Sequence, residues 1–317
     1  MSDPMQIAPA TAPKTRWQRI VDSDIFFSYT RSPVTIIASL VALMLVLMAV
    51  LAPWIAPHTP FDPSTIELMD GFTAPMGDSF SGKSYLFGTD DQGRDLLSTI
   101  MYGSRVSLFV GFSATLFAMV LGISLGLAAG YRGGMLDTVI MRIADVQLSF
   151  PAILIALLIF GVARGLIPPE RQENTAIWVL ILAIGLSNWA QFARTVRGTT
   201  MVERQKDYVS AARLLGRHPL AIVTRHVLPN VLGPVLVIAT ISLALAIIEE
   251  ATLSFLGVGV PPTQPSLGTL IRIGQRFLFS GEWWILAFPA FTLILLALSV
   301  NLLGDWLRDA LNPRLRK

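Results

Sequence analysis

The chain has 317 residues, of which 53% are hydrophobic and only 14% are charged, and its formal net charge is +3. A soluble globular protein carries about 25% charged residues, so this composition predicts a membrane protein. The sequence contains no cysteine, which excludes disulfides and thiolate metal sites. Its basic residues alternate with apolar runs and not with aromatic residues, so we expect no nucleic-acid partner.

Long uncharged runs locate the membrane spans, because a helix needs about 20 apolar residues to cross a bilayer. A charge at the centre of such a helix costs about 3 kcal/mol. Six runs meet this condition, which predicts an all-α membrane protein with six transmembrane helices. The first three runs cover residues 33–56, the stretch that follows Arg105 to residue 130, and about 137–162. The last three lie between residues 173 and 194, between 225 and 249, and between 282 and 305.

The distribution of lysine and arginine predicts the orientation of these helices. If both termini lie inside, sixteen basic residues fall on cytoplasmic segments and seven on the opposite side. We therefore expect both termini in the cytoplasm. The predicted segments are a tail at 1–32, a first helix at 33–56, an extracytoplasmic loop at 57–104, a core of five helices at 105–304 with a cytoplasmic loop at 194–230, and a tail at 305–317.

Two details of the first loop and the third span bear on function. Residues 77–84 satisfy the P-loop pattern GxxxxGK[ST], but a P-loop needs a strand before it and a helix after it. We therefore expect no nucleotide site there.

In the third span, Arg142 and Asp145 are spaced to pair with each other. Pro151 should kink the helix, either as a pivot or as a fixed bend. The segment 163–175 is expected to be a polar external connector.

A stripe of glycines in the second span has the spacing of a helix-packing face. Gly122, Gly126 and Gly130 recur every four residues. Small residues on one side of a membrane helix let a neighbouring backbone approach closely. We expect another helix to pack against this stripe.

Residues 204–230 form a basic segment between two apolar runs. Helical spacing of its apolar residues predicts a short helix with a small apolar face. We expect Asp207 to cap the start of this helix and Gly216 to end it after about three turns. A basic helix lying on the membrane surface is the alternative. The residues of the apolar face are Tyr208, Ala211, Ala212 and Leu215.

Several groups of residues in the chain match a known pattern. The segment Ser210-Ala211-Ala212 with Gly216, followed by the His-Val-Leu-Pro-Asn run at 226–230, resembles the cytoplasmic EAA loop of binding-protein-dependent ABC import permeases. Residues 87–95, 249–259 and 301–314 are similar to other motifs of the dipeptide/oligopeptide permease C subunits. The resemblance covers nearly the whole chain, from about Arg31 to Arg316.

The resemblance implies the type I ABC importer permease fold in a bacterial inner membrane. The implied partners are a second, B-type permease subunit, two ATPase subunits that bind ATP, an extracytoplasmic substrate-binding protein and membrane lipid. The chain itself is expected to bind no cofactor or metal and to catalyse no reaction. Dipeptides or oligopeptides are the expected cargo. Nickel, glutathione and opines are alternative cargoes, and a self-sufficient secondary transporter is a more remote alternative.

The resemblance also implies that the 204–230 segment transmits closure of the ATPases to the membrane helices. Ser210 occupies the position of the family's usual Glu. If Asp207 is the N-cap, residue 210 is the third helical position, where Ser is too short to close a capping box. The implied coupling residues are Asp207, Tyr208, Ser210, Ala211, Ala212, Leu215, Gly216, Arg217, His226 and Pro229.

Two adjacent carboxylates, Glu249 and Glu250, lie at the end of the fifth span. Successive helical positions are about 100° apart, so the pair is unsuited to joint acid and base catalysis. We expect one carboxylate to face a polar translocation path or to pair with Arg272 or Arg276, and the other to reach the outer interface.

Overall fold

The computed structural model describes residues 24–62, 66–261 and 263–311. These residues form α-helices joined by loops, with short 3-10 and π segments and one isolated bridge between Thr89 and Asp95. The prediction of an all-α protein is confirmed. The predicted tails lie partly outside the described residues, and within the described part residues 24–31 form the helix α2 while residues 305–311 continue the last helix.

Within the described residues, five helices are long and apolar enough to cross a membrane. They agree with five of the six predicted runs, although their bounds differ. The first helix ends at Val50, before the predicted 56, whereas other helices extend further because polar residues continue the helical hydrogen bonding outside the apolar region. The second, for example, begins at Leu96 and not near 105. The helices are α3 (Pro33–Val50), α5 (Leu96–Arg132), α8 (Pro169–Glu203), α11 (Leu228–Phe255) and α13 (Trp284–Leu311).

The third predicted span is a broken pair of helices. α6 (Gly134–Leu148) and α7 (Ala152–Leu166) meet at an angle of 99°, so a single helix over 137–162 is wrong. Pro151 is the N-cap of α7. Proline has no N–H to continue the helix and disfavours helical geometry in the residue before it, which explains why the chain turns here.

The predicted connector at 163–175 is almost entirely helical. Only Ile167 and Pro168 separate α7 from α8. The side-chain amide of Gln172 donates hydrogen bonds to the carbonyls of Arg164 and Ile167, each at 3.1 Å. These bonds satisfy carbonyls at the end of α7 and close a tight helical hairpin. The external position of this connector stays a prediction.

The glycine stripe of α5 packs against α8, and these two helices form the most extensive contact in the molecule. A Cβ atom at Gly126 would lie 2.6 Å from the carbonyl oxygen of Ala193, and one at Gly130 would lie 2.8 Å from that of Arg197. The stripe is therefore a packing face, as predicted.

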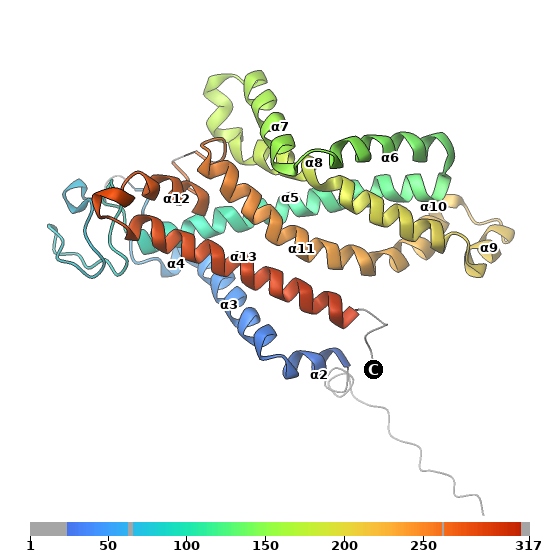
Figure 1. The fold of residues 1–317 in the computed structure, drawn as a ribbon, viewed down its shortest axis with the longest axis horizontal. Coiled ribbons are helices and arrows are strands. Elements are labelled where there is room, and N and C mark those ends of the chain that lie inside the picture. The colour runs from blue at the N-terminus through green and yellow to red at the C-terminus, as the bar shows by residue number, and fades with distance from the viewer. Residues whose placement is uncertain (1–23, 63–65, 262, 312–317) are drawn as a thin grey trace, which may run out of the picture.

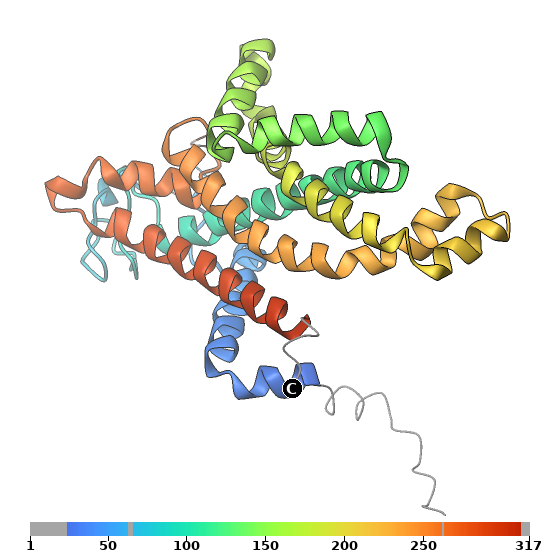
Figure 2. The same ribbon diagram turned by 45° about the vertical axis from the view of Figure 1, so that its right-hand side comes forward.

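The shorter elements gather at the two ends of these long helices. Figures 1 and 2 place α9 (Asp207–Leu214) and α10 (Pro219–Ile222) at one end. The loop that precedes α5 and the helix α12 (Leu267–Gln275) lie at the other end. The remaining short elements are α2 (Asp24–Arg31), α4 (Ala52–Ile55), η1 (Leu68–Asp70), the π segment η2 (Val223–Val227) and η3 (Leu278–Ser280).

The loop before α5 is organised by buried carboxylates. Asp70 is fully buried and accepts hydrogen bonds from the backbone N–H and hydroxyl of Ser81 and from the hydroxyl of Tyr85. Arg94 Nε lies 2.6 Å from a carboxylate oxygen of Asp90, and both side chains are buried. Residues 77–84 have neither a strand before them nor a helix after them, so the P-loop pattern lacks its phosphate-binding geometry.

Candidate functional site

The helix α9 begins one residue earlier than predicted. Its N-cap is Lys206, which has an extended backbone, and Asp207 is the first helical residue with no capping bond from its side chain. The expectation that Asp207 is the N-cap is therefore wrong, and Ser210 is the fourth helical residue and not the third. Asp207 still places a negative charge in the first turn, where the helix dipole favours it.

The end of α9 is formed by Gly216, as predicted. Gly216 has a φ of +70°. Its N–H donates to the carbonyl of Arg213 at 3.0 Å, and the N–H of Arg217 donates to the carbonyl of Ala212 at 3.1 Å. This pair of bonds is a Schellman motif, which satisfies carbonyls that the helix would otherwise leave unpaired. The helix has 8 residues and is shorter than the predicted three turns.

The faces of α9 differ from the predicted apolar face. Val209 and Ala212 are buried in a cluster that includes Phe192 of α8 and Val231 of α11. Leu215 is 81% exposed, and Ala211 and Ser210 are also exposed. The sequence pattern missed Val209 because spacing defines helical faces but does not reveal which face meets the rest of the chain. The exposed side carries two leucines in succession, since Leu214 is 89% exposed.

A hydrogen-bond network centred on the buried Glu203 attaches α9 to α8 and α11. Glu203, the last residue of α8, is 7% exposed and accepts hydrogen bonds of 2.6 Å from the Tyr208 hydroxyl and the Lys206 ammonium. Asn230 of α11 donates to the Tyr208 oxygen at 3.2 Å and to the carbonyl of His226 at 2.7 Å. Burial and the bond to the Glu203 carboxylate raise the pKa of Tyr208 to about 12, so its hydroxyl remains a donor at neutral pH.

A second connection joins this segment to the end of α5. Arg204 donates from Nη1 to the carbonyl of Gly130 at 2.9 Å and to that of Tyr131 at 3.3 Å. The guanidinium of Arg213 lies over the ring of Tyr131, 5.3 Å from its centroid. Cations at the carboxyl end of a helix meet its unpaired carbonyls and the negative end of its dipole. Neither Arg204 nor Glu203 was predicted as a site residue, since nothing in sequence spacing indicates these contacts.

Two of the remaining predicted coupling residues, His226 and Pro229, lie where α11 begins. His226 belongs to the π segment, and its ring stacks on that of Tyr208 with 6.5 Å between centroids. Pro229 lies in the first turn of α11 and is exposed, as is Arg217. A π segment is a local widening of the helix that is frequent at functional sites. Here it joins the short helices to the long span.

The two carboxylates at the end of α11 have different surroundings. Glu249 is half-buried and accepts a hydrogen bond of 2.8 Å from the side-chain amide of Asn188 on α8. Glu250 is fully buried and accepts one of 2.7 Å from the hydroxyl of Ser254. Among the described residues neither forms an ion pair with Arg272 or Arg276. The predicted alternative of an ion pair is therefore wrong, and a carboxylate that faces a translocation path stays a prediction. Oε2 of Glu250 is buried and has no hydrogen-bond partner among the described residues.

Two ion pairs join α6 to α8 instead of lying within one helix. Asp145 lies 2.6 Å from Arg194, and not paired with Arg142 as predicted. Asp137 accepts two hydrogen bonds from Arg197, at 2.5 and 2.7 Å. The helical spacing of Arg142 and Asp145 permits a pair, but α8 supplies arginines to the same side of α6.

The fold is that of a known transporter subunit. It is similar to two structures of the methionine ABC transporter MetNI in inward-facing conformations, with TM-scores of 0.53 and 0.52 at 20% and 21% sequence identity. Each alignment covers 68% of this chain and 96% of the other. At this identity the likeness defines the fold.

Sequence comparison defines the family. Residues 122–317 match the model of the binding-protein-dependent transport system inner membrane component, and residues 23–75 match the N-terminal TM domain of oligopeptide transport permease C. A putative peptide transport system permease of Brucella suis is 42% identical over 86% of each chain. The dipeptide permease DppC of Haemophilus influenzae is 35% identical over 99% of this chain and 100% of its own, and the oligopeptide permease OppC of Bacillus subtilis is 32% identical over 93% and 90%.

The chain therefore belongs to the family of inner membrane components of binding-protein-dependent transport systems. It is a multi-pass permease subunit of an ABC transporter and not the ATPase. An ATPase and a binding protein are the partners that such a system requires.

Proposed function

We propose that this chain is one transmembrane half of an importer of dipeptides and oligopeptides. Its relatives include dipeptide, di/tripeptide and oligopeptide permeases that align over nearly their whole length, and this supports a peptide cargo. The full assembly would contain a second, B-type permease subunit, two ATPase subunits and an extracytoplasmic binding protein. Both termini and the 194–230 loop would face the cytoplasm, in keeping with the excess of lysine and arginine on those segments.

The observation that carries this proposal is the two-sided character of α9. One side is packed and hydrogen-bonded into the chain through Val209, Ala212 and Tyr208. The other side presents the exposed pair Leu214 and Leu215 at the end of the molecule. A helix held on one side and apolar on the other suits insertion into a cleft of an ATPase.

Movement of the ATPases would then reach the membrane helices through fixed contacts. A displacement of α9 would reach α8 through the hydrogen bond between Tyr208 and Glu203. It would reach α11 through the hydrogen bond between Tyr208 and Asn230. Arg204 carries the same displacement to the end of α5. α5, α8 and α11 pack against one another, so the three helices can move as a unit and alternate the exposure of the path between them.

Uptake by the purified and reconstituted complex tests this function. Proteoliposomes that contain this chain with its partner permease, ATPases and binding protein should accumulate radiolabelled dialanine only when ATP is supplied on the cytoplasmic side. Excess unlabelled tripeptide should compete, whereas nickel, glutathione and an opine should not. If only one of these three compounds competed, that compound and not a peptide would be the cargo. Uptake driven by an ion gradient without ATP would support a secondary transporter and contradict the proposal.

A further inference from the structure

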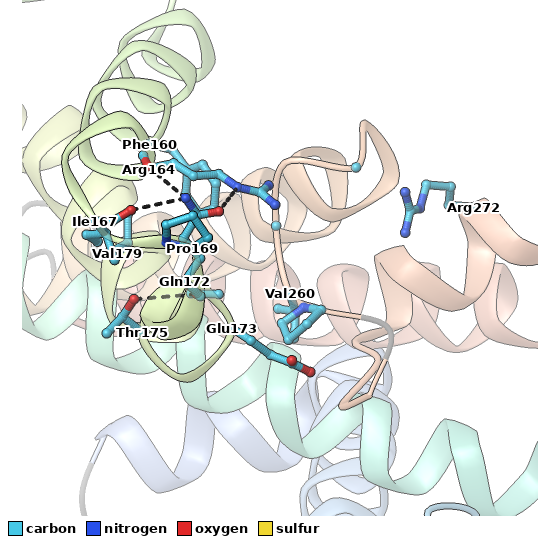
Figure 3. A pocket seen from close by; sticks show the side chains of 14 residues that line it. Phe160, Arg164, Ile167, Pro169, Gln172, Glu173, Thr175, Val179, Val260 and Arg272 are labelled. Carbon is cyan, nitrogen blue, oxygen red and sulfur yellow. Dashed lines mark hydrogen bonds between the residues drawn. The ribbon is translucent and has the colours of Figure 1, made fainter.

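A pocket of about 410 Å³ lies at the opposite end of α11 from α9. It is formed by the turn between α7 and α8 and by residues 257–261, which lead from α11 towards α12 (Figure 3). Its volume is in the range of pockets that hold small molecules. The polar residues that line it are Arg164, Gln172, Glu173, Thr175 and Arg272.

Two guanidinium groups face this pocket from different helices. Figure 3 shows Arg164 of α7 and Arg272 of α12 directed towards each other across residues 257–261. Arg164 donates from Nε to the side-chain oxygen of Gln172 at 3.0 Å. This bond fixes the side chain and leaves its two terminal nitrogens without a hydrogen-bond partner in the described parts of the chain.

Arg272 is held close to the backbone of the pocket wall. Its Nε is buried and has no hydrogen-bond partner among the residues that the structure describes. Gly257 has a φ of +81°, and a Cβ atom at this position would lie 2.8 Å from Nη1 of Arg272. The backbone conformation therefore favours glycine here, and the missing Cβ leaves room for the Arg272 guanidinium where it lies. A buried N–H of a cation without a partner is unfavourable, and an anion bound at the terminal nitrogens of the same guanidinium would offset that cost.

The charges of the lining favour an anion. Glu173 is the only acidic residue among the lining residues, and its carboxylate accepts a hydrogen bond of 2.5 Å from the hydroxyl of Thr263. The two guanidiniums therefore outnumber the carboxylate. Arginine is suited to bind carboxylates because its planar donors match both carboxylate oxygens.

We propose that this pocket binds the free carboxylate of the cargo, with Arg164 and Arg272 as its ligands and Gly257 as the residue that makes room for Arg272. The identity of the cargo as a peptide rests on the proposed function. In the proposed orientation the pocket lies on the extracytoplasmic side, where a peptide released by the binding protein would be held before it enters the path.

Uptake of a peptide and of its amide separates this role from a structural one. In the reconstituted complex, Arg272→Gln should raise the KM for dialanine about tenfold, as expected for loss of a charge-assisted hydrogen bond, and change kcat little. The KM for dialanine amide should not change. Selection by the binding protein affects wild type and variant equally and cancels in this comparison. Arg276→Gln, at the C-cap of the same helix but outside the pocket, is the matched control. An equal effect on both peptides, or none, would overturn the proposal.

Chemical protection tests the pocket without transport. In the intact complex, dialanine should slow the modification of Arg164 and Arg272 by phenylglyoxal, measured by mass spectrometry of peptides, and dialanine amide should not. Arg171 and Arg276 should react with phenylglyoxal at the same rate in the presence of dialanine and of dialanine amide. Wild-type uptake of dialanine without this protection would reject the pocket and leave peptide import in place. Protection without uptake would reject peptide import and leave the carboxylate site in place.

Discussion

The Tyr208 hydroxyl is the residue-scale feature on which the coupling account depends. It donates to Glu203 and accepts from Asn230, so it connects the ends of two spans to one side of α9. Its ring packs against the same buried cluster as Val209. Removal of the oxygen alone should therefore loosen the connection without unfolding the loop.

We predict that Tyr208→Phe reduces coupling. A hydrogen bond to a charged group contributes about 1.5–3 kcal/mol, and its loss should let α9 move without α8. More ATP should be hydrolysed for each peptide transported, by a factor of about three or more. The measurement is the ratio of phosphate released to peptide accumulated in proteoliposomes. Tyr29→Phe, in α2, is the control, and an unchanged ratio in Tyr208→Phe would contradict the role assigned to the hydroxyl.

The pH dependence of the loop before α5 follows from Asp70. Burial alone would raise the pKa of this carboxyl, but hydrogen bonds from Ser81 and Tyr85 outweigh burial and hold the pKa below its usual value. A lowered pKa in the folded state means that the ionised carboxylate stabilises the loop. That stabilisation is complete above about pH 4 and is lost as the pH falls through the folded-state pKa.

We therefore predict that the loop opens in acid and that Asp70→Asn removes most of this dependence. Cleavage of residues 66–95 by pepsin should accelerate between about pH 4 and pH 2 in the wild type. In Asp70→Asn, cleavage should be fast throughout. Asp78→Asn, at an exposed position of the same loop, should resemble the wild type. Equal cleavage of all three proteins would show that Asp70 does not hold the loop.

At the scale of the helix, the end of α9 depends on the backbone of Gly216. Its φ of +70° costs a β-branched residue about 1–2 kcal/mol. We predict that Gly216→Val abolishes transport while the protein still inserts into the membrane, because the Schellman turn sets the direction of the exposed leucines. Gly216→Asn should keep most activity, since Asn tolerates this conformation.

Gly281→Val provides the matched control for this prediction. Gly281 has a φ of +109° and no atoms near its missing Cβ, but it lies beside η3 at the other end of the molecule. Membrane content is measured by immunoblotting and transport by dialanine uptake. Normal uptake in Gly216→Val, or equal loss in both valine variants, would contradict a specific role for the end of α9.

At this scale, the sequence predicts the long helices correctly but not where they break or which residues pair between them. Uncharged runs predict five spans correctly because the charge and the length of an apolar run are read directly from the sequence. The 99° turn before α7 was foreseen only as a kink at Pro151. Asp145 was assigned to Arg142, which is near in sequence, but its partner is Arg194 on another helix. Such contacts depend on tertiary packing.

The position of the candidate site was predicted from the sequence, but most of its contacts were not. Helical spacing located α9 and Gly216 ended it, because both are local properties of the chain. Val209, Glu203 and Arg204 were missed because their importance arises from contacts with α5, α8 and α11. The functional roles of the predicted residues remain predictions.

At the scale of the whole molecule, the two ends have different tasks. The end with α9 presents exposed leucines, and the opposite end carries the carboxylate-anchored loop and the arginine pocket. In the proposed function, nucleotide-dependent movement would act at the α9 end, through partner subunits. The P-loop pattern lies at the other end, in a loop where the backbone N–H of Ser81 donates to Asp70 at 2.9 Å.

We predict that Lys83→Ala leaves both ATP hydrolysis and peptide uptake unchanged. Lys83 Nζ lies 3.9 Å from a carboxylate oxygen of Glu67, an exposed ion pair that contributes at most about 1 kcal/mol. In a true P-loop this lysine contacts phosphate, and its loss would abolish hydrolysis. Both rates are measured in the reconstituted complex. A large fall in hydrolysis would restore the nucleotide-site interpretation.

Site-specific crosslinking tests the coupling claim most directly, and the chain suits it because it contains no cysteine of its own. Leu215→Cys places a thiol on the exposed face of α9, and Phe279→Cys places one at a position that is 97% exposed at the opposite end. A short reagent that joins cysteine to lysine would be added to the assembled transporter, with and without ATP. We predict that residue 215 crosslinks to the ATPase, with a yield that changes on ATP binding, and that residue 279 does not. Crosslinking of residue 279 to the ATPase, or none from residue 215, would contradict the account.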